Sequence, residues 1–364
     1  MEICIVGLPL SGKTTLFFAL TGAHPSRDAA PLARVNLGVA KVADPRLAAL
    51  AAIVSPQRIV PAEVRFVDLP GAPPTQPTAH GIGGESLNAL QRSDALLLVV
   101  RAFDDPTVPH VDQSVDPYRD TATMELELAF SDLAILERRV KRLQAELKAA
   151  KPQDRDRIHR EFALLERLRD GLQRDVPVRA QDLSPEERHA LSGYQLLTAK
   201  PLLILFNVGE GQLPGLPALE QELAARFARP GVRAAALCAR LEHELGQMEP
   251  QEQEEFRHAL GAGEPGAAKT VRLSYDLLGL ITFFTTASAE LKAWPIPQGT
   301  PALKAAGRIH SDMERGFIRA EVISLDDLER CGGLAEARRR GFLRSEGRDY
   351  PVHDADVITF LFNV

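Results

Sequence analysis

Cysteine is scarce in this chain, and its three copies, Cys4, Cys238 and Cys331, lie far apart among 364 residues. An odd number of widely spaced cysteines fits neither a disulfide framework nor a Cys-x-x-Cys metal site. Long apolar runs are also absent, since the longest ones, such as 95–100, are far too short to span a bilayer. The first residues do not have the pattern of a signal peptide. We therefore expect a protein of the reducing cytoplasm that makes no membrane contact.

A strong charge of one sign is absent as well. Lys and Arg number 43 against 49 Asp and Glu, so the formal net charge is -6. This balance does not indicate nucleic-acid binding, and any RNA contact requires a local basic patch. With 45% hydrophobic and 25% charged residues, the composition is globular and excludes global disorder. At roughly 150 residues per domain, the length predicts two to three domains.

The chain does contain a series of short, uninterrupted apolar runs. Such runs are typical of strands that are buried on both faces of a parallel sheet covered by helices. We therefore expect an α/β fold. The runs lie at 3–6, 64–67, 95–100 and 202–206, and a further strand is predicted at 232–238, after a helix that ends near residue 228.

Between the third and fourth runs, apolar residues recur in alternating steps of three and four. This spacing predicts a long helix with a heptad seam. A polar break at 151–157 precedes a second helical set, so we expect an antiparallel helical hairpin, a coiled coil, inserted into the α/β domain. The apolar positions are Leu126, Ala129, Leu133, Leu136, Val140, Leu143 and Leu147 in the first helix, and Ile158, Phe162, Leu165, Leu168 and Leu172 in the second.

The glycine-rich tract 261–269 is predicted to be a linker. Beyond it, short apolar pieces and many glycines predict a small α+β domain that ends in a C-terminal strand at 357–362. The predicted domains are the α/β domain at 1–124 and 198–265, the hairpin at 125–197 and the tail domain at 275–364.

Residues 7–14 match the pattern GxxxxGK[ST] between a predicted strand and a predicted helix at 15–20. In such a loop, backbone N–H groups and the helix N-terminus point at the β-phosphate of a nucleotide. We expect Lys13 to add charge between the β- and γ-phosphates and Thr14 to ligate Mg²⁺ as the cofactor. The candidate nucleotide-binding residues are Gly7, Leu8, Pro9, Leu10, Ser11, Gly12, Lys13, Thr14 and Thr15.

A second motif, DxxG, follows the strand predicted at 64–67 and is formed by Asp68 and Gly71. An aspartate at the carboxyl end of a strand can hold Mg²⁺ through water, and the glycine N–H can meet the γ-phosphate. This short pattern alone is better explained by a plain strand-to-turn connection. Its place after a phosphate-binding loop favours the metal-site interpretation for Asp68 and the phosphate contact for Gly71.

The position for base recognition falls at Asn207, Val208 and Glu210, where a guanine-specific enzyme carries NKxD. Asn207 can brace the phosphate-binding loop and touch the base. The short carboxylate that accepts from the guanine N1 and N2 groups is missing, so guanine specificity is not expected. Cys238 and Ala239, at the end of the next predicted strand, complete the candidate nucleotide-binding residues.

These motifs resemble those of the YchF/Obg-like ATPase family, of the translation-factor class of P-loop GTPases, in which NxxE replaces NKxD. The resemblance covers nearly the whole chain and implies slow hydrolysis of ATP, or of both ATP and GTP. It also implies association with the ribosome, through its large or small subunit, and RNA contact through the hairpin and a β-grasp, TGS-like tail domain. We expect a monomer. The matching tail segments are 282–285, 292–294, 299–300, 305–312, 316–322, 346–350 and 356–358.

The chain departs from the family pattern at three places. Leu10 stands where family loops have an asparagine that could help hold a monovalent cation, and Leu32 aligns with a Mg²⁺-sensing threonine. The residues after DxxG read Ala72-Pro73-Pro74, where the family has a leucine. These changes predict weak or altered hydrolysis. The alternative function is a degenerate scaffold that binds nucleotide or ribosomes with little turnover.

No glutamine follows DxxG directly, so the group that orients the attacking water must come from elsewhere. His110 matches a family histidine with this proposed role, and an imidazole can orient water or accept its proton near neutral pH. The alternative is a surface-loop histidine. His80 is a weaker candidate, and His310 is more simply explained by packing of the tail domain or by its RNA-binding face.

Two basic clusters are candidates for contact with RNA phosphates. The cluster of the tail domain is denser, which makes it the better candidate. The hairpin cluster is interspersed with Glu137 and Glu146, so a solvated coiled-coil face explains it equally well. The clusters are Arg338, Arg339, Arg340, Arg344 and Arg348 in the tail, and Arg138, Arg139, Lys141, Arg142 and Lys148 in the hairpin.

Overall fold

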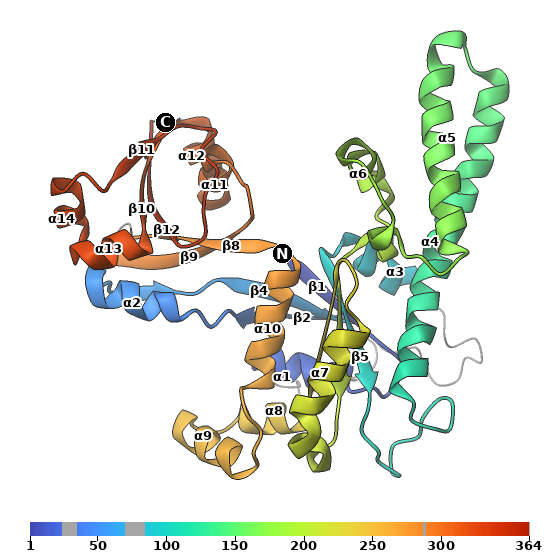
Figure 1. Cartoon of the computed structure of the whole chain (residues 1–364), viewed down its shortest axis with the longest axis horizontal. Helices are drawn as coiled ribbons and strands as arrows, with labels where there is room; N and C mark the ends of the chain where they lie inside the picture. Colours follow the sequence, from blue (N-terminus) through green and yellow to red (C-terminus); the bar gives the residue numbers. More distant parts are fainter. Residues whose placement is uncertain (24–34, 70–83, 287–288, 364) are drawn as a thin grey trace. The chain divides into compact units, whose positions relative to one another are not determined.

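The computed structural model describes residues 1–23, 35–69, 84–286 and 289–363 (Figure 1). By the contacts within it, the chain divides into two compact units. The first unit comprises Met1–Gly38 and Arg65–Leu273, and the second comprises Val39–Val64 and Ser274–Val364.

A six-stranded sheet with the order β2-β4-β1-β5-β6-β7 is the centre of the first unit. The pairs β1–β4, β1–β5, β5–β6 and β6–β7 are parallel. Every residue of β5 and β6 is buried, which explains why these strands are continuous apolar runs in the sequence. The predicted parallel α/β sheet is thus confirmed. Its strands are β1 (Glu2–Val6), β2 (Asn36–Lys41), β4 (Glu63–Asp68), β5 (Ala95–Arg101), β6 (Leu202–Asn207) and β7 (Val232–Leu237).

Helices accompany this sheet, and apolar side chains of three of them, Leu90, Leu223 and Leu241, share a core with its strands. One boundary differs from the sequence-based expectation, because the second half of the linker predicted at 261–269 is helical and starts α10. The helices are α1 (Lys13–Thr21), α3 (Gly84–Arg92), α7 (Leu216–Arg226), α8 (Ala239–Leu245), α9 (Pro250–Ala259) and α10 (Gly266–Leu277), with a 3₁₀ segment η4 (Glu210–Gly215) before α7.

The hairpin consists of α4 (Pro117–Ala149) and α5 (Pro152–Leu172), which run side by side (Figure 1) and share an apolar core of their own. The polar break expected at 151–157 is wrong, because α5 begins at Pro152. Proline is well suited to the first helical position, where its missing N–H has no helical partner to lose. Helix α4 begins in the first unit's main core, which contains Leu128, and enters the hairpin core from Leu136 onward.

The chain returns from the hairpin to the sheet through short elements. Asp132 of α4 is fully buried and accepts hydrogen bonds from the backbone N–H of Leu197 at 2.8 Å and of Thr198 at 2.7 Å, and from the Thr198 hydroxyl at 2.6 Å. This carboxylate therefore anchors the returning chain to α4 just before β6. The short elements are η1 (Val178–Ala180), α6 (Pro185–Leu191), η2 (Ser192–Tyr194) and η3 (Leu197–Ala199).

The second unit contains another six-stranded sheet, with the order β11-β10-β12-β8-β9-β3. Its core is built around the apolar faces of these strands and of α11. The C-terminal strand β12 pairs antiparallel with β10 and parallel with β8. The elements are α2 (Pro45–Val54), β3 (Arg58–Val60), β8 (Leu280–Thr285), β9 (Glu290–Pro297), α11 (Ala302–Ile309), α12 (Ser311–Arg315), β10 (Phe317–Ser324), α13 (Leu325–Cys331), α14 (Leu334–Arg339), β11 (Arg344–Glu346) and β12 (Asp356–Phe362).

Residues Val39–Val64, which include the second half of β2 and the first two residues of β4, belong to this second unit, although the sequence predicts them to be part of the nucleotide-binding domain. Strand β3 within this segment pairs parallel with β9. Arg46 also joins this segment to the C-terminal part of the unit, because its guanidinium forms an ion pair with Asp354 at 2.7 Å. The same guanidinium pairs with the neighbouring Asp44 at 2.8 Å. Such pairing across more than two hundred residues has no local sequence signal.

Candidate functional site

The phosphate-binding loop at residues 7–14, the P-loop, joins β1 to α1 and needs glycine at two positions. Gly7 has a φ of 150° and Gly12 a φ of 92°, both in the region that disfavours residues with a Cβ. A Cβ on Gly7 would lie 2.3 Å from the carbonyl oxygen of Val99, and one on Gly12 would lie 2.2 Å from Nδ2 of Asn207. The loop therefore folds tightly against β5 and the end of β6, and it places Lys13 at the first position of α1.

Lys13 bonds to the P-loop itself. Its Nζ donates to the carbonyl oxygens of Gly7 at 2.9 Å and Leu8 at 2.7 Å. Burial lowers the pKa of this ammonium from 10.5 to about 8, and the nearby Asp68 opposes that shift. Charged phosphate oxygens would stabilise the ammonium form strongly, so this side chain is suited to anion binding.

Asp68, at the end of β4, receives two hydrogen bonds on one oxygen. The Thr14 hydroxyl donates to Oδ2 at 2.9 Å, and Nδ2 of Asn36 donates to the same atom at 3.1 Å. The other oxygen, Oδ1, is buried and has no partner among the described residues. Burial raises the pKa of this carboxyl group. A hydroxyl and a carboxylate with a spare oxygen are ligands that fit Mg²⁺.

Asn36 is a site residue that was not predicted from the sequence. Its amide reaches Asp68 from β2, which neighbours β4 in the sheet but is separated from it by more than twenty residues of chain. An asparagine at the start of a short strand carries no signal of this contact. Asn36 therefore orients the candidate Mg²⁺ ligand from outside the P-loop and the DxxG motif.

Asn207 connects the P-loop to the start of α8. Its Nδ2 donates to the carbonyl oxygen of Ser11 at 3.0 Å, and its Oδ1 accepts from the backbone N–H of Ala239 at 3.0 Å. The neighbouring Val208 and Cys238 are buried, and burial raises the pKa of the Cys238 thiol. This geometry brings three predicted segments together: the P-loop, the end of β6 and the start of α8.

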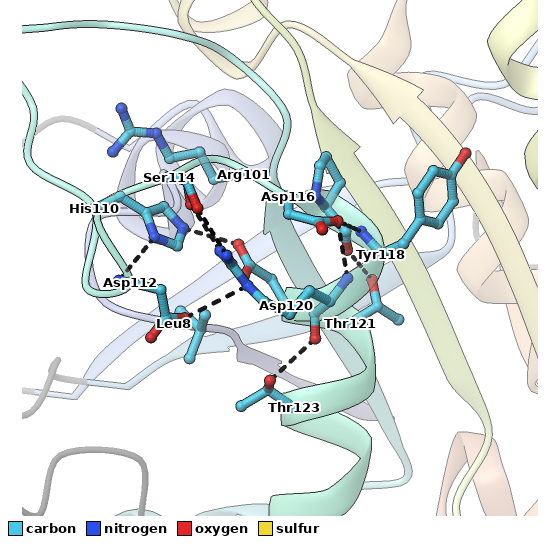
Figure 2. Close-up of polar contacts among 12 residues, drawn as sticks. Leu8, Arg101, His110, Asp112, Ser114, Asp116, Tyr118, Asp120, Thr121 and Thr123 are labelled. Carbon is cyan, nitrogen blue, oxygen red and sulfur yellow. Dashed lines mark hydrogen bonds and ion pairs between the residues drawn. The ribbon is translucent and has the colours of Figure 1, made fainter.

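His110 lies in the loop between β5 and α4, and its side chain is only 6% exposed (Figure 2). Its Nε2 is 2.8 Å from Oδ2 of Asp120, and its Nδ1 accepts from the backbone N–H of Asp112 at 3.1 Å. Both ring nitrogens are thus engaged. Figure 2 also shows Leu8 of the P-loop in the same close-up.

Comparisons with known proteins now identify the family. A model for YchF GTPase C-terminal regions, described as a protein of unknown function, matches residues 280–363, and a model for 50S ribosome-binding GTPases matches residues 2–131. The chain is 38% identical to the ribosome-binding ATPase YchF of Bacillus subtilis and 40% identical to that of Escherichia coli O157:H7, with 99% of this chain and 98% of each relative covered. This chain belongs to the YchF family.

The solved structure of the Schizosaccharomyces pombe YchF GTPase agrees with this assignment. It superposes with a TM-score of 0.86 at 28% identity, over 99% of this chain and 97% of that one. This agreement shows the YchF fold, a parallel-sheet P-loop domain with a helical region and a C-terminal domain.

Some candidate residues of this YchF protein lie outside the described residues. These are Gly71, which was expected at the γ-phosphate, Leu32, Ala72-Pro73-Pro74 and His80. Of the remaining candidates, Leu10 has a φ of 61° and is 53% exposed, so its side chain points away from the loop. Pro9 and Thr15 are partly exposed, whereas Thr14 and Glu210 are exposed.

Arg101 is a functional candidate that the sequence analysis missed. It is the last residue of β5 and is 3% exposed, and its guanidinium donates to backbone carbonyl oxygens of the loop that leads to His110. Its Cζ also lies 4.5 Å from the centre of the Phe103 ring. An arginine that ends an otherwise apolar strand was the available signal. The accepting carbonyls are those of Phe103 and Asp105, each at 3.2 Å, Val108 at 2.9 Å and Pro109 at 3.2 Å.

His310 has a local structural role in the second unit. Its Nδ1 accepts from the backbone N–H of Asp312 at 3.2 Å and so caps the start of α12. The side chain is 63% exposed. Helix capping explains this histidine without any part in the nucleotide site.

Proposed function

We propose that this YchF protein binds ATP, or both ATP and GTP, with Mg²⁺ and hydrolyses it slowly as a ribosome-associated switch. The observation that carries the proposal is the meeting of Lys13, Thr14 and Asp68 at one tightly folded loop, which Asn207 braces. Relatives that match almost the full chain are named ribosome-binding ATPases. The cytoplasm as its compartment and a monomeric state stay predictions.

The residues of the loop have complementary roles in this proposal. The Lys13 ammonium would leave the carbonyls of Gly7 and Leu8 and bind the β- and γ-phosphates. Thr14 and Asp68 would hold Mg²⁺, which neutralises phosphate charge when bound. Gly71 would offer its N–H to the γ-phosphate. His110 would orient the attacking water.

The base would lie against Asn207, Val208, Glu210, Cys238 and Ala239. The exposed Glu210 carboxylate is one methylene longer than the aspartate of a guanine-specific site. This difference removes the short carboxylate that accepts from guanine N1 and N2, and so counts against a preference for GTP.

Ribosomal RNA would contact the hairpin through the exposed stripe formed by Arg138, Lys141, Arg142 and Lys148 of α4. No ion pair joins these four side chains to other described residues, so their charge is available to phosphates. Arg139 is excluded from this basic stripe because it pairs with Glu161 at 2.9 Å.

The arginine cluster of the tail is largely neutralised within its own unit. Arg338 pairs with Glu321 at 2.6 Å, and Arg340 pairs with Glu336 at 2.5 Å. Arg339 also pairs with Glu336, and Arg344 pairs with Glu346 and Asp356. The hairpin cluster is therefore the better candidate for RNA contact. The density of arginines in the sequence alone favours the tail cluster instead.

A second candidate function is a nucleotide-binding scaffold with little turnover. The observation that favours it is the state of His110, whose two ring nitrogens are both engaged and so offer no lone pair to water. Leu10, with its outward side chain, provides no ligand for a monovalent cation.

Titration of the purified protein with fluorescent ATP and GTP analogues, with and without Mg²⁺, tests the proposed site. We expect Mg²⁺-dependent binding that is tighter for ATP and is lost in Lys13→Ala. Absence of Mg²⁺-dependent binding to either nucleotide would refute the site, and markedly tighter binding of GTP would refute the base assignment. Sedimentation with ribosomes in each nucleotide state tests the partner, and failure to co-sediment in every state would exclude it.

A further inference from the structure

His110 is held from two sides by residues that follow it in the chain. Its Nδ1 accepts from the Asp112 N–H at 3.1 Å, and a ring nitrogen that accepts a hydrogen bond carries no proton. The proton of the neutral ring must then be on Nε2, which donates to Oδ2 of Asp120 at 2.8 Å. The two contacts together select one tautomer.

The hydrogen bonds of His110 to Asp120 and to Asp112 differ in how deeply the partner residue is buried. Asp120 lies in the first turn of α4 (Figure 2) and is 2% exposed. Its other oxygen, Oδ1, accepts from Nε and Nη2 of Arg119 at 3.1 and 2.9 Å. Asp112 is exposed and lies in the loop before this helix. The bond to Asp120 is therefore fixed by buried structure, whereas the bond to the Asp112 N–H depends on an exposed segment.

A metal ion is a poor explanation for this cluster. Ligand atoms of His110, Asp112 and Asp120 lie within 4.8 Å of one another, which is close enough for a cation. The Arg119 guanidinium already lies 3.7 Å from Asp112 and 2.9 Å from Asp120. Its charge compensates both carboxylates and would repel a cation placed among them.

We propose that Asp120 is a positioning residue for His110, because it holds the Nε2–H tautomer and leaves Nδ1 as the nitrogen that accepts a hydrogen bond from the attacking water. Nδ1 becomes available when the exposed Asp112 N–H moves away, while the buried bond to Asp120 persists. The same division of roles between a carboxylate and a histidine occurs in Ser-His-Asp hydrolases, where the buried aspartate fixes the tautomer. This inference rests on the proposed nucleotide hydrolysis.

The variant Asp120→Asn tests the proposal with little change of volume, because a neutral amide can bond to either tautomer. We expect kcat for phosphate release to fall about 10- to 100-fold or more, the lower range being the cost of losing a carboxylate that orients a metal-binding histidine. The nucleotide Kd stays within about twofold, since Asp120 lies outside the P-loop. Asp120→Glu keeps the carboxylate but displaces it, and we expect an intermediate kcat.

The matched control is Asp116→Asn. Asp116 caps the same helix through the N–H groups of Tyr118 and Arg119, each at 3.1 Å, and does not bond to His110. A general weakening of the start of α4 would lower kcat in this variant as well. We expect its kcat to stay near that of the wild type.

Long-range ¹H–¹⁵N spectra of protein labelled at histidine report the tautomer directly, with His110→Gln assigning the signal. We expect the Nε2–H form in the wild type and a mixture in Asp120→Asn. Wild-type kcat in Asp120→Asn, equal losses in Asp116→Asn, or an unchanged tautomer in Asp120→Asn would each overturn the proposal. If the wild type released no more phosphate than Lys13→Ala, the proposed function would fail, and the spectra would still decide whether Asp120 sets the tautomer.

Discussion

Lys13 combines the charge that phosphates require with an environment that opposes this charge. Burial lowers its pKa to about 8, while its Nζ bonds to carbonyls of the same loop. The anionic oxygens of a bound nucleotide would raise the pKa of Lys13 and replace the loop carbonyls as partners of its Nζ. The protonation state of one side chain therefore links nucleotide affinity to pH.

We predict that the affinity for ATP falls as the pH rises above about 8, because the free protein then loses the Lys13 proton that the bound state requires. The slope approaches about tenfold per pH unit, the limit for one proton. Fluorescence titration between pH 7 and 9.5 measures it. Lys13→Met should bind weakly with no such slope, and a flat wild-type profile would contradict the prediction.

A second prediction at this scale concerns Asn36, which donates to Asp68 at 3.1 Å. Asn36→Ala removes this orientation, and a lost hydrogen bond to a charged group of about 1 to 2 kcal/mol corresponds to a 5- to 30-fold higher Mg²⁺ requirement. Titrating Mg²⁺ at fixed ATP measures the shift. The exposed Asn88 on α3 provides the control, Asn88→Ala. An unchanged Mg²⁺ midpoint in Asn36→Ala would show that Asp68 needs no such support.

At the scale of elements, the loop between β5 and α4 depends on the buried guanidinium of Arg101. Arg101→Met leaves four backbone carbonyls without this donor, so we expect faster amide exchange over residues 102–110 and a lower kcat at unchanged nucleotide Kd. Exchange measured by mass spectrometry and single-turnover kinetics check both. Arg65→Met, at an exposed arginine of β4, is the control. Unaltered exchange in the loop would exclude this role.

The junction of the hairpin with the sheet depends on Asp132. Asp132→Ala leaves three buried donors of Leu197 and Thr198 unpaired, so we expect the free energy of unfolding to fall by about 2 to 4 kcal/mol. Urea denaturation measures the loss. Asp156→Ala, at an exposed position of α5, should change it by less than about 0.5 kcal/mol. Equal stabilities of the two variants would argue against the anchor.

Local patterns in the sequence were sufficient for the strands and the P-loop. The apolar run of β5 and the glycines around Lys13 each report their own environment, burial on both faces or a tight turn. Asn36 and Arg101 act through contacts that form only when distant strands or loop carbonyls meet. The place of Arg101 at the end of an apolar strand marks it as unusual, but the sequence does not show which groups either side chain contacts. The same reason explains why the pairing of β3 with β9 was not foreseen.

At the scale of the whole molecule, the net charge of -6 conceals an uneven distribution of basic side chains that have no acidic partner in the described part of the chain. The basic stripe of the hairpin is unpaired among the described residues, whereas the arginines from 338 to 344 meet acids of their own unit. Among the described residues, no helix is long and apolar enough to cross a membrane. The partner surface that we propose is thus an RNA phosphate surface at the hairpin.

Charge reversal distinguishes the two basic regions. We predict that the triple variant Arg138→Glu, Lys141→Glu, Arg142→Glu weakens co-sedimentation with ribosomes about tenfold or more and reduces its salt dependence. The same change at Arg338, Arg339 and Arg340 should have a smaller effect, because these side chains are already paired. A larger loss from the tail variant would reverse the assignment.

Phosphate release from ATP, measured at saturating Mg²⁺ with and without ribosomes, tests the central claim most directly. We expect slow release that requires Mg²⁺, exceeds that of Lys13→Ala and falls in Asp120→Asn. Release from wild type that equals Lys13→Ala, both alone and with ribosomes, would contradict it and leave a nucleotide-binding scaffold as the function.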